Sequence, residues 1–356
     1  MTTILDCTLR DGSYEVNFSF TANDTSIICR ELEEAGVGLI EIGHGVGLGA
    51  TERTKQKAIQ SDEEYMVAAN EALTKAKWGM FCIPGIATID DVDHAARHNM
   101  GFIRVGTDIN KVESSRPFIA RAKEHGMLVA ANYMKSNATT PMEFARLAKM
   151  SQSFGADCVY IVDSSGGMLF KEIKAFYCAI REVTDIPVGF HGHNNLGLAN
   201  ANSILAAEMG IEYIDSTLQG LGRSAGNAIT ESLVLALLKS GIDIKIDYMK
   251  LIQTGQKYIR PLIKKFGHRA VDLIAGFAEF HSSYMPHVQT ISSKYQINPL
   301  ILMIEMSKVD KVDVTLSKLE EVAQHLEKNK DIYMGSYELN AYVGGEQDYL
   351  KKRADE

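Results

Sequence analysis

The sequence predicts an α/β protein whose main domain is a closed parallel barrel, and three observations support this. Short β-rich runs alternate with longer amphipathic segments through residues 1–244, which is typical of parallel strands joined by helices. Eight such units occur there, and eight strands, each followed by a helix, close into a (β/α)8, or TIM, barrel. No G-x-G-x-x-G motif follows the first strand, so a doubly wound open sheet is the weaker alternative.

The predicted strands are short runs rich in β-branched, aromatic and other apolar residues. They cover residues 2–8, 38–44, 77–83, 102–108, 128–134, 158–164, 187–193 and 213–219. The segments between them carry apolar side chains at helical spacing, and several end in a glycine that suits a helix C-terminus. Helices are expected over residues 25–36, 90–99, 117–126, 143–155, 171–183, 201–210 and 227–241.

The remainder of the chain has a different pattern. From residue 245 to residue 330 the apolar spacing is helical, which predicts a helical C-terminal domain. We therefore expect a TIM-barrel catalytic domain over residues 1–244, a helical domain over 245–330 and a polar tail or interface arm over 331–356.

Composition excludes several function classes. At 356 residues and a formal net charge of -8, the chain lacks the basic face that binding to nucleic acid or an anionic membrane requires. The start "MTTILDCTLR" has no basic region before an apolar run, and no apolar stretch reaches the length of a membrane helix. We expect a cytoplasmic protein. Its cysteines form no C-x-x-C pair, which predicts reduced core thiols; they are Cys7, Cys29, Cys82, Cys158 and Cys178.

Charged residues and histidines, which can bind metals or take part in catalysis, follow two of the strands. The first strand runs into "DCTLRDGSY", which holds Arg10 and Asp11 where a turn needs at most one charged group. The seventh ends in "HGHNN", where His191 and His193 are two residues apart and so point to the same side. An isolated H-x-H is weak evidence, since such histidines often serve packing. Joined to Asp11, however, the pair predicts a two-histidine, one-carboxylate metal site with open positions.

Five motifs then support a family resemblance: "TLRDGS", "EIGHGVGLG", "VDSSGG", "HGHNNLGLANANS" and "GLGRSAGN". Together they resemble the metal-dependent TIM-barrel aldolases and lyases, a superfamily that includes HMG-CoA lyase, isopropylmalate synthase and the 4-hydroxy-2-oxovalerate aldolases. The spacing is closest to the last of these. The likeness extends from residue 3 to about residue 310 and includes "HSSYMPHVQTISSKY", so it is specific for the superfamily and less so for the substrate.

The resemblance implies a mechanism. Asp11, His191 and His193 would hold Mn²⁺ or Mg²⁺, and the protein would be a class II pyruvate aldolase that cleaves or forms a 4-hydroxy-2-oxo acid from pyruvate and an aldehyde. Breaking the bond between C3 and C4 leaves a pyruvate enolate, whose charge the cation and Arg10 would stabilise.

Further site residues follow from the same resemblance. Ser164 and Asn227 would join Arg10 in binding substrate. For these two, an ordinary loop serine and a helix N-cap remain the alternatives. Asp6 is read as a barrel-interior or supporting carboxylate, and His44 as facing the site or as a structural histidine of a glycine-rich turn.

Two positions depart from the resembling aldolases. Tyr14 stands where they have a histidine general base, and His281 stands in the helical domain where they have a tyrosine. We expect His281 to be the base, because its ordinary pKa suits proton transfer at neutral pH, while Tyr14 orients the hydroxyl or aldehyde oxygen. The alternative is that neither residue is catalytic and that the substrate differs.

Charged residues elsewhere suggest two further possibilities. The segment "GATERTKQKAIQSDEE" brings Arg53, Lys55 and Lys57 near the barrel mouth, either as a solvated loop or as a site for an anionic aldehyde. Lys135, after the fifth strand, could instead form a Schiff base with the substrate, as in lysine-dependent aldolases, and the metal triad would then be redundant.

Other function classes stay open. A Claisen-type acyl-CoA synthase or lyase of the same superfamily is the main alternative, and a non-catalytic partner subunit is another. Biotin carboxyltransferases share the barrel but need a modified lysine where this chain has Val162. In the resembling aldolases an acylating aldehyde dehydrogenase receives the aldehyde, although their Gly-Gly-Gln-Glu-Asp run is missing at the expected place. We also expect a homo-oligomer.

Overall fold

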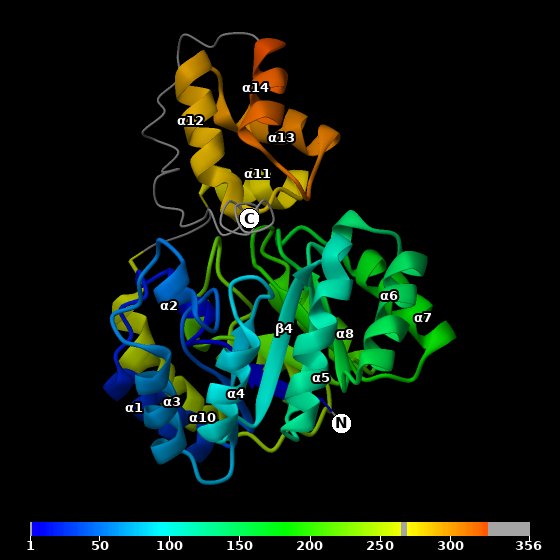
Figure 1. The fold of residues 1–356 in the computed structure, drawn as a ribbon. Coiled ribbons are helices and arrows are strands. Elements are labelled where there is room, and N and C mark those ends of the chain that lie inside the picture. The colour runs from blue at the N-terminus through cyan, green and yellow to red at the C-terminus, as the bar shows by residue number, and fades with distance from the viewer. Residues whose placement is uncertain (1, 265–268, 327–356) are drawn as a thin grey trace.

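A computed structural model describes residues 2–264 and 269–326. Its eight parallel strands close into a barrel in chain order, β1 to β8, with β8 pairing back onto β1 (Figure 1). The strands are β1 (Thr3–Asp6), β2 (Leu39–Glu41), β3 (Lys77–Cys82), β4 (Phe102–Asp108), β5 (Leu128–Met134), β6 (Cys158–Asp163), β7 (Val188–Gly192) and β8 (Tyr213–Ser216). The predicted fold class and all eight predicted strands are therefore confirmed.

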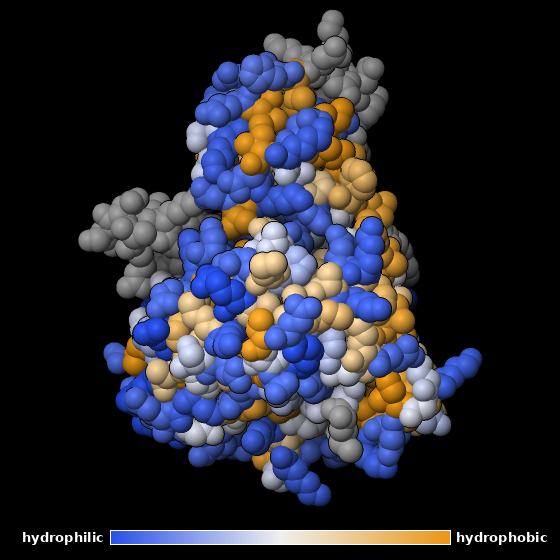
Figure 2. Space-filling view, turned by 90° about the vertical axis from the view of Figure 1, so that its right-hand side faces the viewer, coloured by the Kyte–Doolittle hydropathy of each residue, from blue (hydrophilic) through white to orange (hydrophobic). Residues whose placement is uncertain are grey.

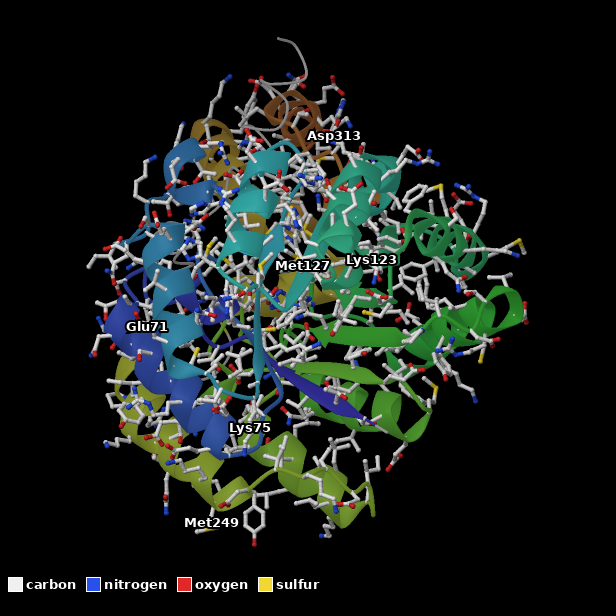
Figure 3. The ribbon with its side chains drawn as sticks, turned by 60° about the horizontal axis from the view of Figure 1, so that its bottom comes forward. Glu71, Lys75, Lys123, Met127, Met249 and Asp313 are labelled. Atoms are coloured by element: carbon white, nitrogen blue, oxygen red, sulfur yellow. The ribbon has the colours of Figure 1, made fainter. Side chains whose placement is uncertain are left out.

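Helices surround the barrel, as Figure 3 shows from below. They are α1 (Ala22–Glu34), α2 (Ala50–Arg53), α3 (Asp62–Ala72), α4 (Ile89–Arg97), α5 (Arg116–Glu124), α6 (Pro141–Phe154), α7 (Phe170–Val183), α8 (Ala199–Glu208) and α9 (Thr230–Lys239). Local sequence explains several helix starts: Thr21, Ser61 and Thr88 each accept an N–H from an acidic residue three positions on, which completes a capping box. The charged segment after β2 thus contains α2 and the start of α3 and is not a loop throughout.

The barrel has two distinct layers of packing. Alternation along β4 sends Ile103 and Val105 outward into the large cluster between strands and helices. Phe102 faces inward and closes the barrel interior with Leu5, Cys7 and Leu39. Arg104, two residues further on, is fully buried at the next level. The interior therefore changes from apolar to charged toward the carboxyl ends of the strands.

The C-terminal part divides differently from the predicted boundary at residue 245. Helix α10 (Tyr248–Thr254) packs with the barrel, since Leu251 belongs to the barrel's outer cluster and Lys250 pairs with Glu31 and Glu34 of α1. Figures 1 and 3 show α10 in the ring of barrel helices, with Met249 labelled in the latter. We therefore propose that the domain boundary falls after α10, near residue 264.

The helical domain above the barrel has its own core. Its helices are α11 (Ala270–Ala278), α12 (Met285–Tyr295), α13 (Pro299–Val309) and α14 (Leu316–Gln324), and they bury a separate apolar cluster. This domain sits over the carboxyl ends of the strands (Figure 1). The predicted polar tail, residues 331–356, lies outside the described residues.

The face shown in Figure 2 mixes hydrophilic and apolar side chains, and the apolar ones gather on the helical domain and along one edge of the barrel. The exposed apolar residues of the helical domain include Phe277 and Val309, which are 68% and 63% exposed. Four of the cysteines are buried as predicted, but Cys178 is exposed, because it lies on the outer face of α7. Within the described ranges, no helix combines the length and the apolar character needed to cross a bilayer.

Candidate metal centre and active site

The loop after β1 folds tightly over the barrel mouth. The Cys7 carbonyl accepts the N–H groups of Arg10 and Asp11 at 3.2 and 2.8 Å, and a short 3-10 turn, η1 (Asp11–Tyr14), follows. Both charged side chains are consequently buried. Asp6 does not join them: it bonds Thr8 and lies near Thr230 of α9. Burial raises the pKa of Asp6 to about 7, and its role is structural, on the helix-facing side of β1.

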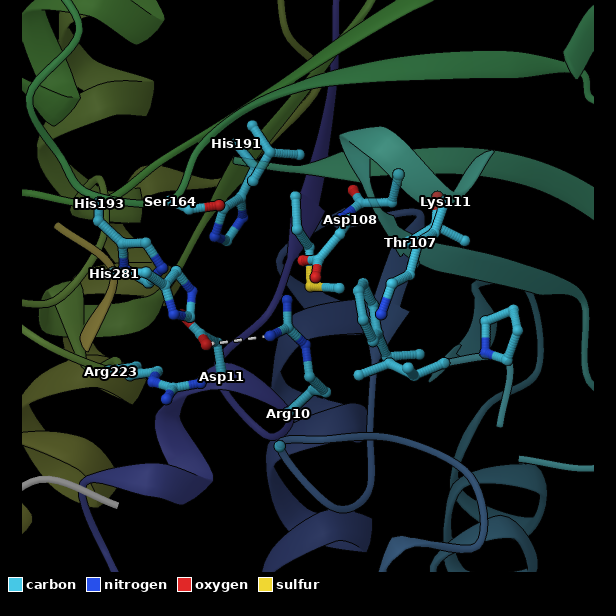
Figure 4. A pocket seen from close by; sticks show the side chains of 18 of the residues that line it. Arg10, Asp11, Thr107, Asp108, Lys111, Ser164, His191, His193, Arg223 and His281 are labelled. Atoms are coloured by element: carbon cyan, nitrogen blue, oxygen red, sulfur yellow. Dashed lines mark hydrogen bonds and ion pairs between the residues drawn. The ribbon is translucent and has the colours of Figure 1, made fainter. Parts of the chain in front are cut away.

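The three predicted metal ligands meet at one point. A ligand atom of Asp11, of His191 and of His193 lies within 4.8 Å of each of the others, and all three residues are buried. Figure 4 shows the two rings and the carboxylate converging. Burial opposes ionisation of Asp11, but Arg10 and the two histidines outweigh it and hold the pKa of that carboxyl well below its usual range. Burial lowers the pKa of His193 to about 4.

Outer contacts orient both rings. His191 Nδ1 lies 2.8 Å from Asp215 Oδ2, and His193 Nδ1 lies 3.3 Å from the Gly226 carbonyl. Each ring therefore donates from Nδ1 and leaves Nε2 unprotonated in the neutral form. A carboxylate or carbonyl that fixes the tautomer in this way is the usual support of a metal-binding histidine.

Asn227 adds a further oxygen beside the triad. Its Nδ2 donates to Asp11 Oδ2 at 2.5 Å, while its buried Oδ1 has no hydrogen-bond partner within the described ranges. The backbone at Gly222 comes so close that an added Cβ would lie 2.2 Å from Asn227 Nδ2 and 3.1 Å from Asp11 Oδ2. The donor set of carboxylate, two imidazoles and a spare amide oxygen fits a divalent cation.

A buried chain of charges connects Arg10 to the metal site. Arg10 Nε donates to Glu41 Oε2 at 2.7 Å, and Arg104 Nη1 donates to the same oxygen at 3.0 Å. Arg104 Nη2 donates to Asp215 Oδ2 at 2.5 Å, and that oxygen also holds His191. Arg10 and His191 are thus positioned by one network that crosses the barrel interior.

Sequence reasoning missed Arg104 and Asp215. The available signal was a charged residue at an inward-facing position of an otherwise apolar strand, in "FIRVGTD" and "YIDST". Burying an unpaired charge is costly, so each of these residues implied a partner of opposite charge on another strand.

One pocket, of about 830 Å³ including its open mouth, collects the predicted site residues except Asn227, which lies behind Asp11 and does not line it. Arg10, the metal triad, Ser164, Tyr14 and His281 all line it. Ser164 Oγ accepts the Lys135 N–H at 2.9 Å, so its own proton can be donated to a ligand. Gly45 makes room for the Tyr14 ring, which an added Cβ would approach to 2.5 Å.

Tyr14 and His281 are both positioned by neighbouring side chains. The Arg223 guanidinium lies 4.7 Å from the centre of the Tyr14 ring. His281 Nδ1 accepts the Ser283 N–H at 3.2 Å and contacts Ser283 Oγ at 2.7 Å. Burial, with Arg223 and Lys135 nearby, holds the pKa of His281 well below its ordinary value. The neutral ring therefore carries its proton on Nε2.

Other polar residues that the sequence analysis considered form contacts outside the pocket. Arg53 forms a two-pronged pair with Asp91, and Lys57 donates to the Thr51 and Glu52 carbonyls. His44 stacks on Phe18 and accepts the Val46 N–H, so it is structural. Neither Arg53, Lys57 nor His44 lines the pocket.

Lys135 belongs to the contact between the two domains. Its Nζ lies 3.1 Å from Asp108 Oδ1 and donates to the Tyr284 hydroxyl at 2.8 Å. Its amine is thus engaged by a carboxylate and a phenol and does not line the pocket, so it is not placed to form a Schiff base with a substrate there.

A closed (β/α)8 barrel with a buried carboxylate and two histidines at the carboxyl ends of its strands is typical of barrel enzymes that use a divalent cation. The chain belongs to the HMGL-like family, whose model matches residues 2–257. It is 34% identical over 328 residues to 4-hydroxy-2-oxovalerate aldolase of Carboxydothermus hydrogenoformans, covering 91% of this chain and 97% of that protein. It is 36% identical over 309 residues to 4-hydroxy-2-oxovalerate aldolase 2 of Rhodococcus jostii, covering 86% and 90%. The resemblance predicted from the motifs is confirmed.

Solved structures agree with this assignment. The N-terminal domain of a Bacteroides vulgatus protein described as an aldolase superposes with a TM-score of 0.64 at 29% identity, covering 77% of this chain and 92% of that one. The carboxyl transferase domain of Rhizobium etli pyruvate carboxylase gives a TM-score of 0.75 at 19% identity, covering 91% of this chain and 61% of that one. At that identity the second likeness concerns the fold alone.

Proposed function

We propose that the protein is a divalent-metal-dependent pyruvate aldolase that cleaves or forms a 4-hydroxy-2-oxo acid. The observation that carries the proposal is the meeting of Asp11, His191 and His193 in one pocket with Arg10. Membership of the HMGL-like family and the names of the relatives support it. The ion would be Mn²⁺ or Mg²⁺, since both accept mixed oxygen and nitrogen ligands with open positions.

The catalytic demands can be divided among this chain's residues. A bound divalent cation supplies a Lewis acid for the keto oxygen of the 2-oxo acid. Arg10 places a fixed cation beside that oxygen, where negative charge develops as the C3–C4 bond breaks. Ser164 donates its hydroxyl proton to the substrate carboxylate, and Asn227 holds Asp11 in place from below while offering Oδ1 to the site.

His281 and Tyr14 act on the aldehyde oxygen. The sequence predicted His281 as the base that removes the C4 hydroxyl proton. With Nδ1 accepting the Ser283 N–H, Nε2 carries the proton and can only donate. We therefore revise the role: His281 Nε2–H donates a hydrogen bond to the C4 oxygen and stabilises the negative charge on it, while Tyr14 orients the same oxygen. The proton of the C4 hydroxyl would leave to water in the open pocket during cleavage and return from water during bond formation.

Two variants of His281 distinguish these roles. We expect His281→Ala to lower turnover by about 10²- to 10³-fold, the usual effect of losing one donor to a developing oxyanion, with Mn²⁺ affinity unchanged. His281→Gln should keep much of the activity, because a glutamine amide presents a donor where Nε2 lies but cannot act as a base. Steady-state kinetics with Tyr14→Phe as comparison test this. Equal losses in both His281 variants would support the base instead.

Arg10 allows a separate prediction. Arg10→Lys should lower turnover by roughly 10²-fold or more, because a point ammonium does not reproduce the fixed donors of a guanidinium. Mn²⁺ binding, measured by titration calorimetry, should remain. Unchanged turnover combined with weaker metal binding would show that Arg10 only supports the site.

One experiment tests the proposed function as a whole. The metal-loaded protein is incubated with pyruvate in D₂O and then with a panel of aldehydes, with NMR following both. Exchange of the pyruvate methyl protons without coenzyme A, followed by carbon–carbon bond formation, supports the aldolase. Dependence on an acyl-CoA would favour the Claisen-type alternative, which has no better support than the aldolase. The carboxyltransferase alternative is disfavoured because the apolar Val162 lines the pocket where a ligating lysine is needed.

Assembly remains a prediction. A homo-oligomer is expected, and coupling to an acylating aldehyde dehydrogenase is the less favoured possibility. Light scattering of the full chain measures its oligomeric state.

A further inference from the structure

The pocket has a deep end and an outer end. Among the residues that line it, only Lys111 and Ser114 are exposed, so they mark its mouth. Figure 4 shows Lys111 and Asp108 on the side opposite His193, Asp11 and Arg223, with Arg10 between the two groups. When the 2-oxo acid occupies the metal end, the remainder of the substrate extends toward Lys111.

Lys111 is held at the mouth by its own turn. It lies in η2 (Ile109–Ser115), where its backbone leaves helical geometry at φ -125°, and Ser114 Oγ donates to its carbonyl at 2.8 Å. Among the described residues, its ammonium takes part in no ion pair. A lysine whose backbone is fixed at the mouth of a pocket, and whose ammonium forms no ion pair with a described carboxylate, is suited to bind an anionic ligand.

Two other charged side chains of the pocket already have partners of opposite charge. Arg10 pairs with Glu41 and Asp11, and Asp108 lies 3.1 Å from Lys135 Nζ. Asp108 therefore brings little net repulsion to an anion that passes it. Arg223, another cation that lines the pocket, lies against the Tyr14 ring on the side of the metal triad. Lys111 is therefore the cation at the outer end of the pocket.

We propose that the aldehyde partner carries an anionic group, a carboxylate or a phosphate ester, at the end remote from its carbonyl, and that Lys111 binds it. The inference rests on the proposed aldolase function and adds the substrate class to it. For Arg53, Lys55 and Lys57, in the segment after β2, the sequence left open a solvated loop or an anion site. None of the three lines the pocket, and we assign the anion to a residue of the loop after β4.

Matched aldehydes test the proposal. Succinic semialdehyde is compared with butyraldehyde, and glyceraldehyde 3-phosphate with glyceraldehyde, each condensed with pyruvate by the Mn²⁺-loaded full chain. We expect kcat/KM to be at least tenfold higher for the anionic member of one pair, and that pair identifies carboxylate or phosphate as the group. Lys111→Ala should remove this advantage, mainly through KM, and leave the neutral aldehydes unaffected, since a lost charged hydrogen bond costs about tenfold or more in affinity.

Two variants serve as controls. Lys111→Arg keeps the cation and should retain most of the preference, and Lys55→Ala removes an exposed lysine that does not line the pocket and should change nothing. No preference in either pair, or equal effects of Lys111→Ala on charged and neutral aldehydes, would overturn the inference. Failure of the proposed function is a different result: no exchange of pyruvate protons and no condensation with any aldehyde.

Discussion

Asp11→Asn is expected to lower the affinity for Mn²⁺ by more than about 100-fold and to reduce turnover to that of the chelated wild-type protein. The carboxylate is the only anionic ligand of the triad, and its charge is sustained in a buried site by Arg10 and two histidines. Changing a residue that merely supports a ligand typically costs 10- to 100-fold, so loss of the anionic ligand itself should cost more. Titration calorimetry and electron paramagnetic resonance of Mn²⁺ measure the binding directly.

Asp6→Asn provides a matched control for Asp11. Both carboxylates are buried near the end of β1, but Asp6 lies on the helix-facing side and bonds Thr8. An asparagine keeps an acceptor for the Thr8 N–H, so metal affinity and turnover should be unchanged. Tight Mn²⁺ binding by Asp11→Asn, or full activity of the wild-type protein after exhaustive chelation, would refute the metal site.

The second large effect concerns stability. Arg104→Leu should lower the free energy of unfolding by about 3–5 kcal/mol, the usual result of breaking a buried ion pair by removing one partner. Arg104 is fully buried between Glu41 and Asp215. Leucine would leave Glu41 with Arg10 as its remaining partner and Asp215 with His191 alone. Urea denaturation monitored by circular dichroism measures the change.

The same variant should also affect the metal site. Asp215 Oδ2 contacts both Arg104 and His191, so losing Arg104 should weaken Mn²⁺ binding by about 10- to 100-fold. Arg146→Leu, which removes an exposed arginine paired with Glu143 on α6, is the control and should change stability by less than about 1 kcal/mol.

A double variant separates charge from packing. Adding Asp215→Asn to Arg104→Leu removes the buried carboxylate charge that has lost its arginine partner and should restore part of the stability. Simple additivity of the two changes would show that Arg104 acts by filling volume and that the charge network is not coupled.

Local sequence was sufficient for the barrel and for the centre of its site. The strands could be identified from sequence because successive side chains of a strand point to opposite faces, so the pattern depends only on the strand's own residues. Asp11, His191 and His193 could then be brought together without coordinates, since the carboxyl ends of all strands in a parallel barrel meet at one face. The same logic placed Ser164 beside them.

Tertiary structure decided what depends on partners from distant segments. Helical spacing predicted α10 but not that Leu251 would pack on the barrel. The sequence allowed Arg53 to bind an anion, but in the fold its guanidinium pairs with Asp91. Lys111 lies at the mouth of the pocket, and among the described residues no acidic side chain pairs with it. His281 was predicted as a base because its residue type suits that role. The local contact between the Ser283 N–H and His281 Nδ1 supports the donor role that we propose instead. Residue type and periodicity specify which groups are present and which side of an element they face. Which groups become paired depends on strand register and on the packing of loops from separate units, and that pairing sets each group's charge and direction.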